Sequence, residues 1–211
     1  MIKNHKLVIE YDGTPFSGWQ RQTDRITVQG QLEKVLSKIL NQKISIHGSG
    51  RTDAGVHAQG QVASFKADTQ IPSDEIKTAV NRMIKYPIVI KECCTIDPDF
   101  HAQYSALSKE YHYYILNRTD PMAIGRQYHW HIRQPLDFDC MQQCCKKLVG
   151  TFDFKSFENT GSPRTSTVRE ILTAGFIRPE KGILRFEISA SGCLKYMVRN
   201  IVATLVMAGK G

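Results

Sequence analysis

The chain has 211 residues, with 28 lysines and arginines against 20 aspartates and glutamates, so its formal net charge is +8. This length excludes a disulfide-stapled miniprotein and allows one large domain or two small ones, each with its own core. Hydrophobic residues make up 41% and charged residues 23%, which excludes a largely disordered chain. The basic excess favours a polyanionic partner, and nucleic acid is the first candidate.

Two further features bear on the compartment. No stretch of the sequence approaches the apolar length that a bilayer requires, and charged residues interrupt the amino end before a signal peptide could form. The six cysteines include the adjacent pairs Cys93-Cys94 and Cys144-Cys145 but no C-x-x-C spacing, which fits neither a disulfide framework nor a zinc ribbon. We predict a soluble, cytoplasmic protein with reduced thiols and no membrane attachment.

The first half of the chain alternates between strand and helix patterns. Leu7, Ile9 and Tyr11 share one side of a predicted strand over 6–11. Apolar residues at helical spacing predict a helix over 28–39 with Thr27 as its N-cap. The other elements predicted here are strands over 43–47 and 61–66, a helix over 73–84 capped by Ser73, and a strand over 88–94. The predicted order is therefore β-α-β-β-α-β.

A polar stretch with a proline, over 97–108, predicts the boundary to a second unit. The elements predicted beyond it are a strand over 110–116, a helix over 137–149, strands over 168–177 and 184–188 joined by a turn at 179–182, and a helix over 195–208.

The same order returns in this second unit, but without its last strand. We therefore predict an α+β protein of two ferredoxin-like, or RRM-like, β-α-β-β-α-β modules over residues 1–105 and 106–211. A module without its last strand would expose an unpaired sheet edge, so we expect the natural chain to continue past Gly211.

The loop between the two middle strands of the first module, over 48–60, concentrates reactive side chains. Its four glycines allow sharp turns and close approach to a ligand. Arg51, beside Asp53, provides a cation that can keep the carboxylate ionised, and a fixed, ionised aspartate is a nucleophile or a base. The alternative is a glycine-rich turn that carries an ordinary surface ion pair.

Two other sites can be weighed for this loop. Gly50 and Gly55 have the glycine spacing of a phosphate-binding P-loop, but the two residues that follow are not the required Lys and Ser or Thr, so we reject that site. His47, Asp53 and His57 would be the ligands of a metal-dependent RNA hydrolase, but no second acidic or histidine cluster lies near them in the sequence. We expect no metal.

Residues 50–58, GRTDAGVHA, resemble the signature of the tRNA pseudouridine synthase A family. Further matches in the family's order are YDGTPFSGWQ at 11–20, TVQG at 27–30, DPDFHA at 97–102 and MVRNIV at 197–202. Several separated matches in the right order are more specific than any one of them, and they span nearly the whole chain. The sequence departs from the usual family pattern at Pro87, Gln103, Cys193, Lys195 and Ala203; Gln103 stands where an arginine is usual.

By this resemblance Asp53 is the catalytic aspartate, Tyr111 is the active-site tyrosine, and Arg51 and Arg199 face the aspartate or the target nucleotide. The family converts uridine to pseudouridine in the anticodon stem-loop of tRNA, at tRNA positions 38–40, without a cofactor. It acts as a homodimer, with active sites in clefts between the two modules. The resemblance thus implies the pseudouridine synthase fold and activity.

These residue types suit that reaction. The isomerisation breaks a glycosidic C–N bond, turns the uracil over and joins its C5 to the ribose, so no redox cofactor is needed. A carboxylate can stabilise positive charge at the sugar, or add to the sugar or the base. A tyrosine can help to remove the C5 proton. An internal uridine must first leave its stack, at a cost of about a few kcal/mol, so an arginine is expected near the nucleophile.

The predicted substrate-binding residues are Tyr111, Arg51, His57, Lys109, Arg164, Arg169 and Lys195. Taken singly, each of the basic residues is more often a solvated side chain. A second function stays open at this point, because paired RNA-binding-like modules with a net charge of +8 could bind or remodel tRNA without chemistry.

Overall fold

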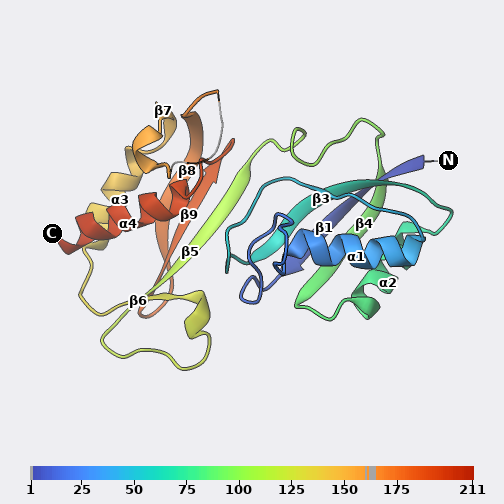
Figure 1. The fold of residues 1–211 in the computed structure, drawn as a ribbon. Coiled ribbons are helices and arrows are strands. Elements are labelled where there is room, and N and C mark those ends of the chain that lie inside the picture. Colours follow the sequence, from blue (N-terminus) through green and yellow to red (C-terminus); the bar gives the residue numbers. More distant parts are fainter. Residues whose placement is uncertain (1, 160, 162–164) are drawn as a thin grey trace. The chain divides into compact units, whose positions relative to one another are not determined.

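The computed structural model describes residues 2–159, 161 and 165–211. The chain forms two compact units, Met1–Ala106 and Leu107–Gly211, and this division lies one residue beyond the predicted one. Each unit combines one β-sheet with α-helices, so the predicted α+β class is confirmed (Figure 1).

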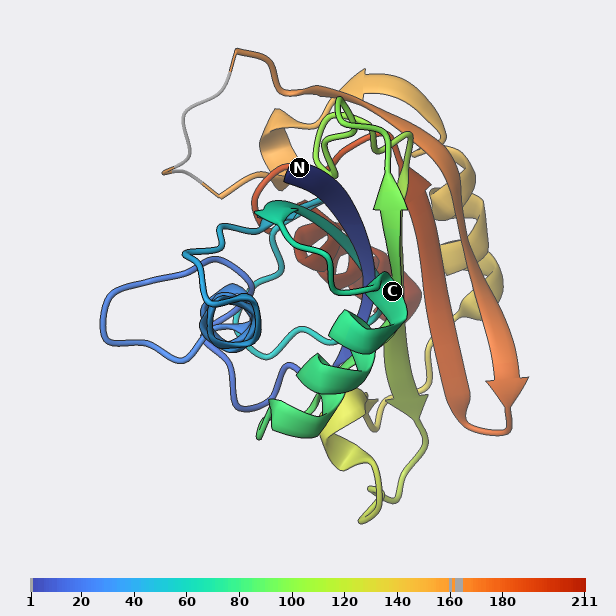
Figure 2. The same cartoon turned by 90° about the vertical axis from the view of Figure 1, so that its right-hand side faces the viewer.

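The first unit has the predicted order of elements, which are β1 (Ile2–Tyr11), α1 (Val28–Leu40), β2 (His47–Gly48), β3 (Ala58–Asp68), α2 (Ser73–Met83) and β4 (Ile88–Ile96). Its sheet has the order β2-β3-β1-β4 with antiparallel neighbours, which is the ferredoxin-like arrangement. Both helices cover one face of this sheet (Figure 2) and share one apolar core with it.

The two helix caps predicted in this unit have different outcomes. Thr27 caps α1, and its side chain accepts a hydrogen bond from the Gly30 backbone N–H as predicted. The predicted Ser73 cap is wrong, because Ser73 is already the first residue of α2 and Pro72 stands before it without a side-chain hydrogen bond. The Ser73 hydroxyl instead lies 3.4 Å from Nδ1 of His5.

The strand predicted over 43–47 is also wrong, since only His47–Gly48 forms β2. Ile44 and Ile46 alternate because both side chains are buried in the core. Their backbone N–H groups donate to side chains of α1, to Oγ of Ser37 at 2.9 Å and to Oε1 of Glu33 at 3.0 Å. The apolar alternation in this segment therefore indicates that the side chains are buried. It does not indicate backbone hydrogen bonds to a neighbouring strand.

His5 is a buried histidine in the first core. Its ring is 1% exposed and stacks on Phe65, and Nε2 has no hydrogen-bond partner among the residues that the structure describes. Burial, assisted by the charge of Lys3, lowers the pKa of His5. Below about pH 6.5 the unfolded chain therefore binds more protons at this residue than the folded chain does.

We expect the free energy of unfolding to fall as the pH drops below about 6.5 and through the lowered pKa of the folded His5. His5→Phe should flatten this part of the profile, because phenylalanine keeps the ring but cannot be protonated. Urea unfolding between pH 5 and 8 measures the effect, with His112→Phe, at an exposed position, as the control. An unchanged slope in His5→Phe would show that other groups cause the acid sensitivity.

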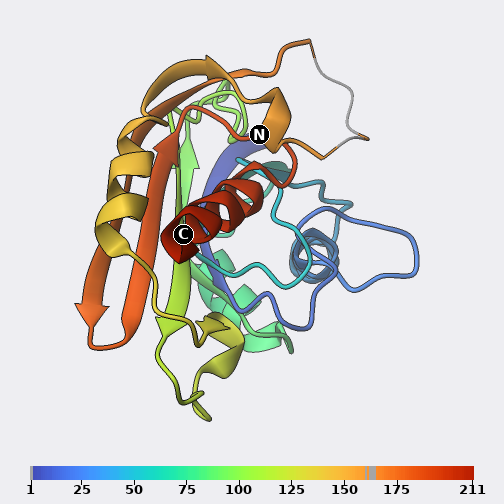
Figure 3. The same cartoon turned by 90° about the vertical axis from the view of Figure 1, so that its left-hand side faces the viewer.

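The second unit contains β5 (Lys109–Asn117), β6 (Trp130–Ile132), α3 (Phe138–Lys146), β7 (Gly150–Asp153), β8 (Val168–Glu180), β9 (Ile183–Ala190) and α4 (Met197–Lys210), with 3-10 turns at Arg126–Tyr128 and Lys155–Phe157. The sheet order is β6-β5-β9-β8-β7. Figure 3 shows α3 and α4 along one face of this sheet, where residues of both helices join the second core.

Three details of this unit differ from the sequence prediction. The short strands β6 and β7 were not predicted, and the turn is shorter than expected because β8 continues to Glu180, which leaves a loop of Lys181 and Gly182. Gly182 has φ of +80°, a conformation that glycine adopts readily. β6 pairs in parallel with the last three residues of β5, and among the described residues no strand follows α4.

Two predictions on composition can be compared directly. All six cysteines are free, in agreement with the expected reduced thiols. Within the described part of the chain, no helix is both long enough and apolar enough to span a bilayer.

Candidate active site

Asp53 is half-buried in the loop that joins β2 to β3, one residue after Thr52. The segment after β1 holds this loop. The backbone N–H of Trp19 donates to the carbonyl oxygen of Thr52 at 3.0 Å, and the hydroxyl groups of Tyr11 and Thr52 are 2.8 Å apart. Because Tyr11 and Trp19 are both buried in the first core, the backbone just before Asp53 is anchored to that core.

The contact between the two segments requires glycine at two positions. A Cβ on Gly13 would overlap the carbonyl oxygen of Val56, and a Cβ on Gly18 would lie 2.6 Å from the carbonyl oxygen of Thr52. Gly18 also has φ of +94°, in the left-handed region. The two glycines thus allow the segment after β1 to pass directly against the backbone on either side of Asp53.

The other side of the loop is fixed by hydrogen bonds to β3. Gln61 is buried; its amide nitrogen donates to the carbonyl oxygen of Gly50 at 2.8 Å, and its Oε1 accepts from the hydroxyl of Ser49 at 2.7 Å. The carbonyl oxygen of Asp53 accepts from the N–H of Val56 at 3.1 Å, which closes a turn. The exposed Arg51 lies between these anchors, and its predicted pairing with Asp53 stays a prediction.

His57 connects the loop to the segment after β1. Its Nδ1 accepts a hydrogen bond from the N–H of Gly13 at 3.0 Å, and the same nitrogen lies 3.0 Å from Oδ1 of Asp12. The contact with Gly13 requires a lone pair on Nδ1, whereas pairing with Asp12 requires a proton there, so the two contacts require different positions of the ring proton. The structure thus gives His57 a role in holding the loop, and the predicted contact with substrate stays a prediction.

The metal alternative receives no support from the donor groups. Across residues 2–159, 161 and 165–211, no three His, Cys, Asp or Glu side chains are grouped so that they could hold a metal ion. His47 has its ring against another aromatic residue, at 4.9 Å from the ring of His101.

The remaining predicted residues lie at one end of the second unit, where β5 begins and β9 ends. Lys109 pairs with Ala190 in the β5–β9 register, and Tyr111 pairs with Ile188. Tyr111 is partly buried against the second core, and it helps to lower the pKa of Cys193, just beyond β9. Register and core packing therefore hold the tyrosine that the family resemblance singles out.

The pKa of the Cys193 thiol reflects both its burial and the charges near it. Burial raises the pKa of its thiol to about 11, although the positive charges of Lys109 and Arg169 and the hydrogen bond with Tyr111 act in the opposite direction. The thiol is therefore protonated near neutral pH and is a poor nucleophile. Lys109 and Arg169 thus both contribute positive charge that acts on this thiol.

Tyr196 gathers two further predicted residues at the start of α4. It occupies the N-cap position with φ of +62°, a left-handed conformation that is uncommon for a tyrosine. Nζ of Lys195 is 5.9 Å and Cζ of Arg199 is 5.6 Å from the centre of its ring, near the outer limit of cation–π attraction. The exposed ring thus has a cation from the preceding loop and another from the first turn of the helix.

The structure therefore distributes the predicted residues over both units. Arg51, Asp53 and His57 belong to the first unit, whereas the second unit gathers Tyr111, Lys109, Arg169, Lys195 and Arg199 at one end. Arg164 lies outside the described residues. The roles assigned to these residues stay predictions. Sequence reasoning missed the anchoring by Trp19 and Gln61, although the motif over 11–20 was a signal for the first of these.

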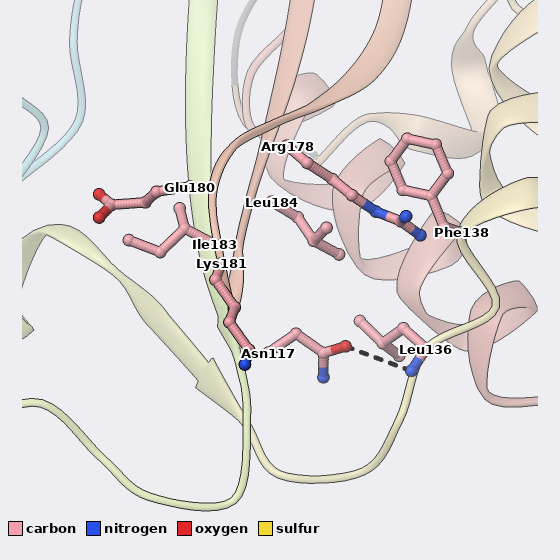
Figure 4. A pocket seen from close by; sticks show the side chains of 9 residues that line it. Asn117, Leu136, Phe138, Arg178, Glu180, Lys181, Ile183 and Leu184 are labelled. Carbon is pink, nitrogen blue, oxygen red and sulfur yellow. Dashed lines mark hydrogen bonds between the residues drawn. The ribbon is translucent and has the colours of Figure 1, made fainter.

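A cavity of about 470 Å³ lies at the opposite end of the second unit, beside the last residue of β5 (Figure 4). The Arg178 guanidinium lies 4.0 Å from the centre of the Phe138 ring, and Oδ1 of Asn117 accepts from the N–H of Leu136 at 3.3 Å. None of the predicted site residues lines this cavity, so we do not assign it to the active site.

Comparison with known proteins gives a consistent result. The profile of a family described as tRNA pseudouridine synthase matches residues 7–105 and 144–211. A protein of Acetivibrio thermocellus named tRNA pseudouridine synthase A is 43% identical over 210 residues, which cover 100% of this chain and 86% of that protein. Proteins with the same name from Clostridium botulinum and Thermoanaerobacter pseudethanolicus are 43% and 41% identical, with the same coverage.

These matches cover the Asp53 loop, the Tyr111 strand and the first turn of α4, and the ferredoxin-like first unit agrees with them. The chain therefore belongs to the tRNA pseudouridine synthase family and is an enzyme that isomerises uridine in tRNA to pseudouridine.

Proposed function

We propose that this enzyme modifies uridines in the anticodon stem-loop, with the carboxylate of Asp53 as its nucleophile. The observation that carries the proposal is the fixation of the backbone around Asp53, by Trp19 through Thr52 on one side and by Gln61 through Gly50 on the other. A carboxylate on an anchored backbone keeps its orientation during the reaction, and such preorganisation is worth several kcal/mol to a reaction that depends on alignment.

The reaction conserves all atoms, and each proposed group has one task. The bond between the ribose C1′ and uracil N1 breaks while Asp53 compensates the positive charge at the sugar or forms the covalent adduct. A bond from C1′ to C5 then forms, and the proton that leaves C5 is balanced by the proton that N1 gains. Tyr111 stacks on the base and assists the removal of the C5 proton. Arg51 and Arg199 bind the everted nucleotide.

The position of the target uridine can be tested with tRNA transcripts that carry uridine in defined arms. A transcript with uridines only in the anticodon stem-loop should form pseudouridine, whereas one with uridines only in the acceptor and D arms should not. Pseudouridine is mapped at nucleotide resolution after incubation with the intact protein. Modification confined to the second transcript would refute the proposed target.

The affinity for tRNA should depend on salt through the basic end of the second unit. We expect log affinity to fall linearly with log salt concentration, with a slope of about −0.7 to −0.9 for each phosphate contact. Lys109→Gln, Arg169→Gln and Lys195→Gln should each reduce the slope by about one contact. Lys181→Gln, in the loop at the opposite end of the unit, is the matched control. A nearly flat salt response of the unchanged protein would exclude a footprint of several phosphates.

We also propose that the enzyme is a cytoplasmic homodimer, on the strength of the family resemblance. Light scattering should then give a molar mass of about twice the 23.9 kDa of one chain. A mass of one chain at micromolar concentration would refute the dimer.

A further inference from the structure

Three rings from two distant segments lie against one another on the first unit: His101 stacks on Tyr104 with an interplanar angle of 29°, and the His47 ring is tilted by 41° against His101. The ring centres of His47 and His101 are 4.9 Å apart, and those of His101 and Tyr104 are 4.4 Å apart. His47 belongs to the edge strand β2, whereas His101 and Tyr104 follow β4. A stack between residues so far apart in the chain needs a backbone that holds both segments in place.

Buried hydrogen bonds supply that support. Ala102, between the two stacked residues of the second segment, is 1% exposed, and its N–H donates to Oγ of the buried Ser64 at 3.2 Å. Asn4 is also buried, and its side-chain nitrogen donates to the carbonyl oxygens of Asp97 at 2.8 Å and Phe100 at 2.9 Å. The segment therefore remains in place although its ring side chains lie at the surface.

The orientation of the His101 ring is fixed as well. Its Nδ1 accepts a hydrogen bond from the N–H of Gln103 at 3.2 Å, and its backbone is bound to Ser105 by a hydrogen bond from the Ser105 N–H at 2.8 Å. The outermost ring is open, because Tyr104 is 79% exposed. One face of the Tyr104 ring packs on His101, and the side chain is otherwise exposed. Such a partly ordered ring loses little conformational entropy when a flat group stacks on it.

The place of the stack relates it to the substrate. His47 begins β2, whose end leads directly into the loop that carries Asp53. Arg51, in that loop, is exposed. Gln103, between His101 and Tyr104, is uncharged, so the exposed part of this segment offers ring faces and an amide.

We propose that the stack of His47, His101 and Tyr104 is a binding platform for an unpaired base of the tRNA substrate. The inference rests on the proposed action on the anticodon stem-loop, whose loop bases are unpaired. Proteins recognise unpaired RNA bases by stacking them on aromatic side chains, and this contact tolerates any base because every base has a π-face. The net charge of +8 favours the same partner.

The test compares tRNA affinities at one fixed salt concentration. Tyr104→Ala should raise the dissociation constant at least about fivefold, at the low end of what one lost stack costs, without changing the salt slope. Tyr104→Phe should bind as the unchanged protein does, because the ring is kept. Leu107→Ala removes a neighbouring side chain that is 91% exposed and should leave the affinity within about twofold.

A direct contact gives a second signal. The fluorescence of Tyr104→Trp should be quenched by an isolated anticodon stem-loop and much less by a duplex of the same length. Equal affinities of Tyr104→Ala and Leu107→Ala would overturn the proposal. It would also fall if Tyr104→Ala changed the molar mass of the protein and not the tRNA affinity, because the stack would then be a contact between copies.

Failure of the platform is distinguishable from failure of the proposed function. Pseudouridine formation outside the anticodon arm would refute the proposed target, but the affinity comparison would still report whether Tyr104 contacts tRNA. Conversely, unchanged affinity of Tyr104→Ala together with correct modification of the anticodon arm would remove the platform and leave the proposed function in place.

Discussion

Asp53→Asn should reduce pseudouridine formation by at least about 10³-fold and leave the dissociation constant for tRNA within about threefold of its original value. Asparagine has nearly the same shape as aspartate, so the anchored backbone from Thr52 to Val56 should keep its conformation. The amide lacks the negative charge and the nucleophilic oxygen, and a group that acts only in the chemical step lowers the rate without weakening binding. Release of tritium from uracil C5 measures the rate, and filter binding measures the affinity.

Asp24→Asn is the matched control for this experiment. Asp24 is an exposed aspartate of the same unit, and its φ of +57° is a conformation that asparagine tolerates. Its substitution should leave both rate and affinity unchanged. Equal tritium release by Asp53→Asn and Asp24→Asn would remove Asp53 from the mechanism. Loss of tRNA binding together with activity in Asp53→Asn would mean that the carboxylate organises the binding surface.

The sequence was sufficient for most helices and long strands because burial imposes a period on them. Leu32 and Leu36 lie one helical turn apart in α1 and are fully buried, as the spacing predicts. The same signal failed at Ile44 and Ile46, which alternate in burial but give their N–H groups to the side chains of α1. Alternating burial of side chains does not determine which group accepts the hydrogen bond from each backbone N–H. β6, with three residues, is too short to show any period.

In the candidate site, too, local features could be predicted from the sequence and long-range contacts could not. The Asp53 loop could be found because its glycines and charged residues are contiguous, whereas the contact between Tyr11 and Thr52 joins residues 41 positions apart. No local pattern encodes such a pairing. Tyr111 and Cys193, whose pKa the tyrosine helps to lower, are also far apart in the sequence. The reactive residues could thus be identified from the sequence, but the long-range contacts that orient them could not.

Gly13→Ala should lower the free energy of unfolding by about 1–3 kcal/mol and reduce kcat at least about tenfold. The added methyl group would overlap the backbone carbonyl of Val56, which cannot rotate away as a flexible side chain could. Either the segment after β1 or the Asp53 turn must move. Displacements of about 1 Å can cost about 10²-fold in rate when a reaction depends on alignment.

Gly60→Ala tests whether this loss is specific, because it makes the same change in the same unit at a position with open space around its Cβ. It should alter neither kcat nor stability by a measurable amount. Activity is compared well below the unfolding midpoint of Gly13→Ala, so that the folded fraction is nearly complete. A lower kcat with unchanged tRNA affinity would then mean that the segment after β1 acts through the orientation of Asp53. Wild-type stability and rate in Gly13→Ala would contradict the close approach of the two backbones.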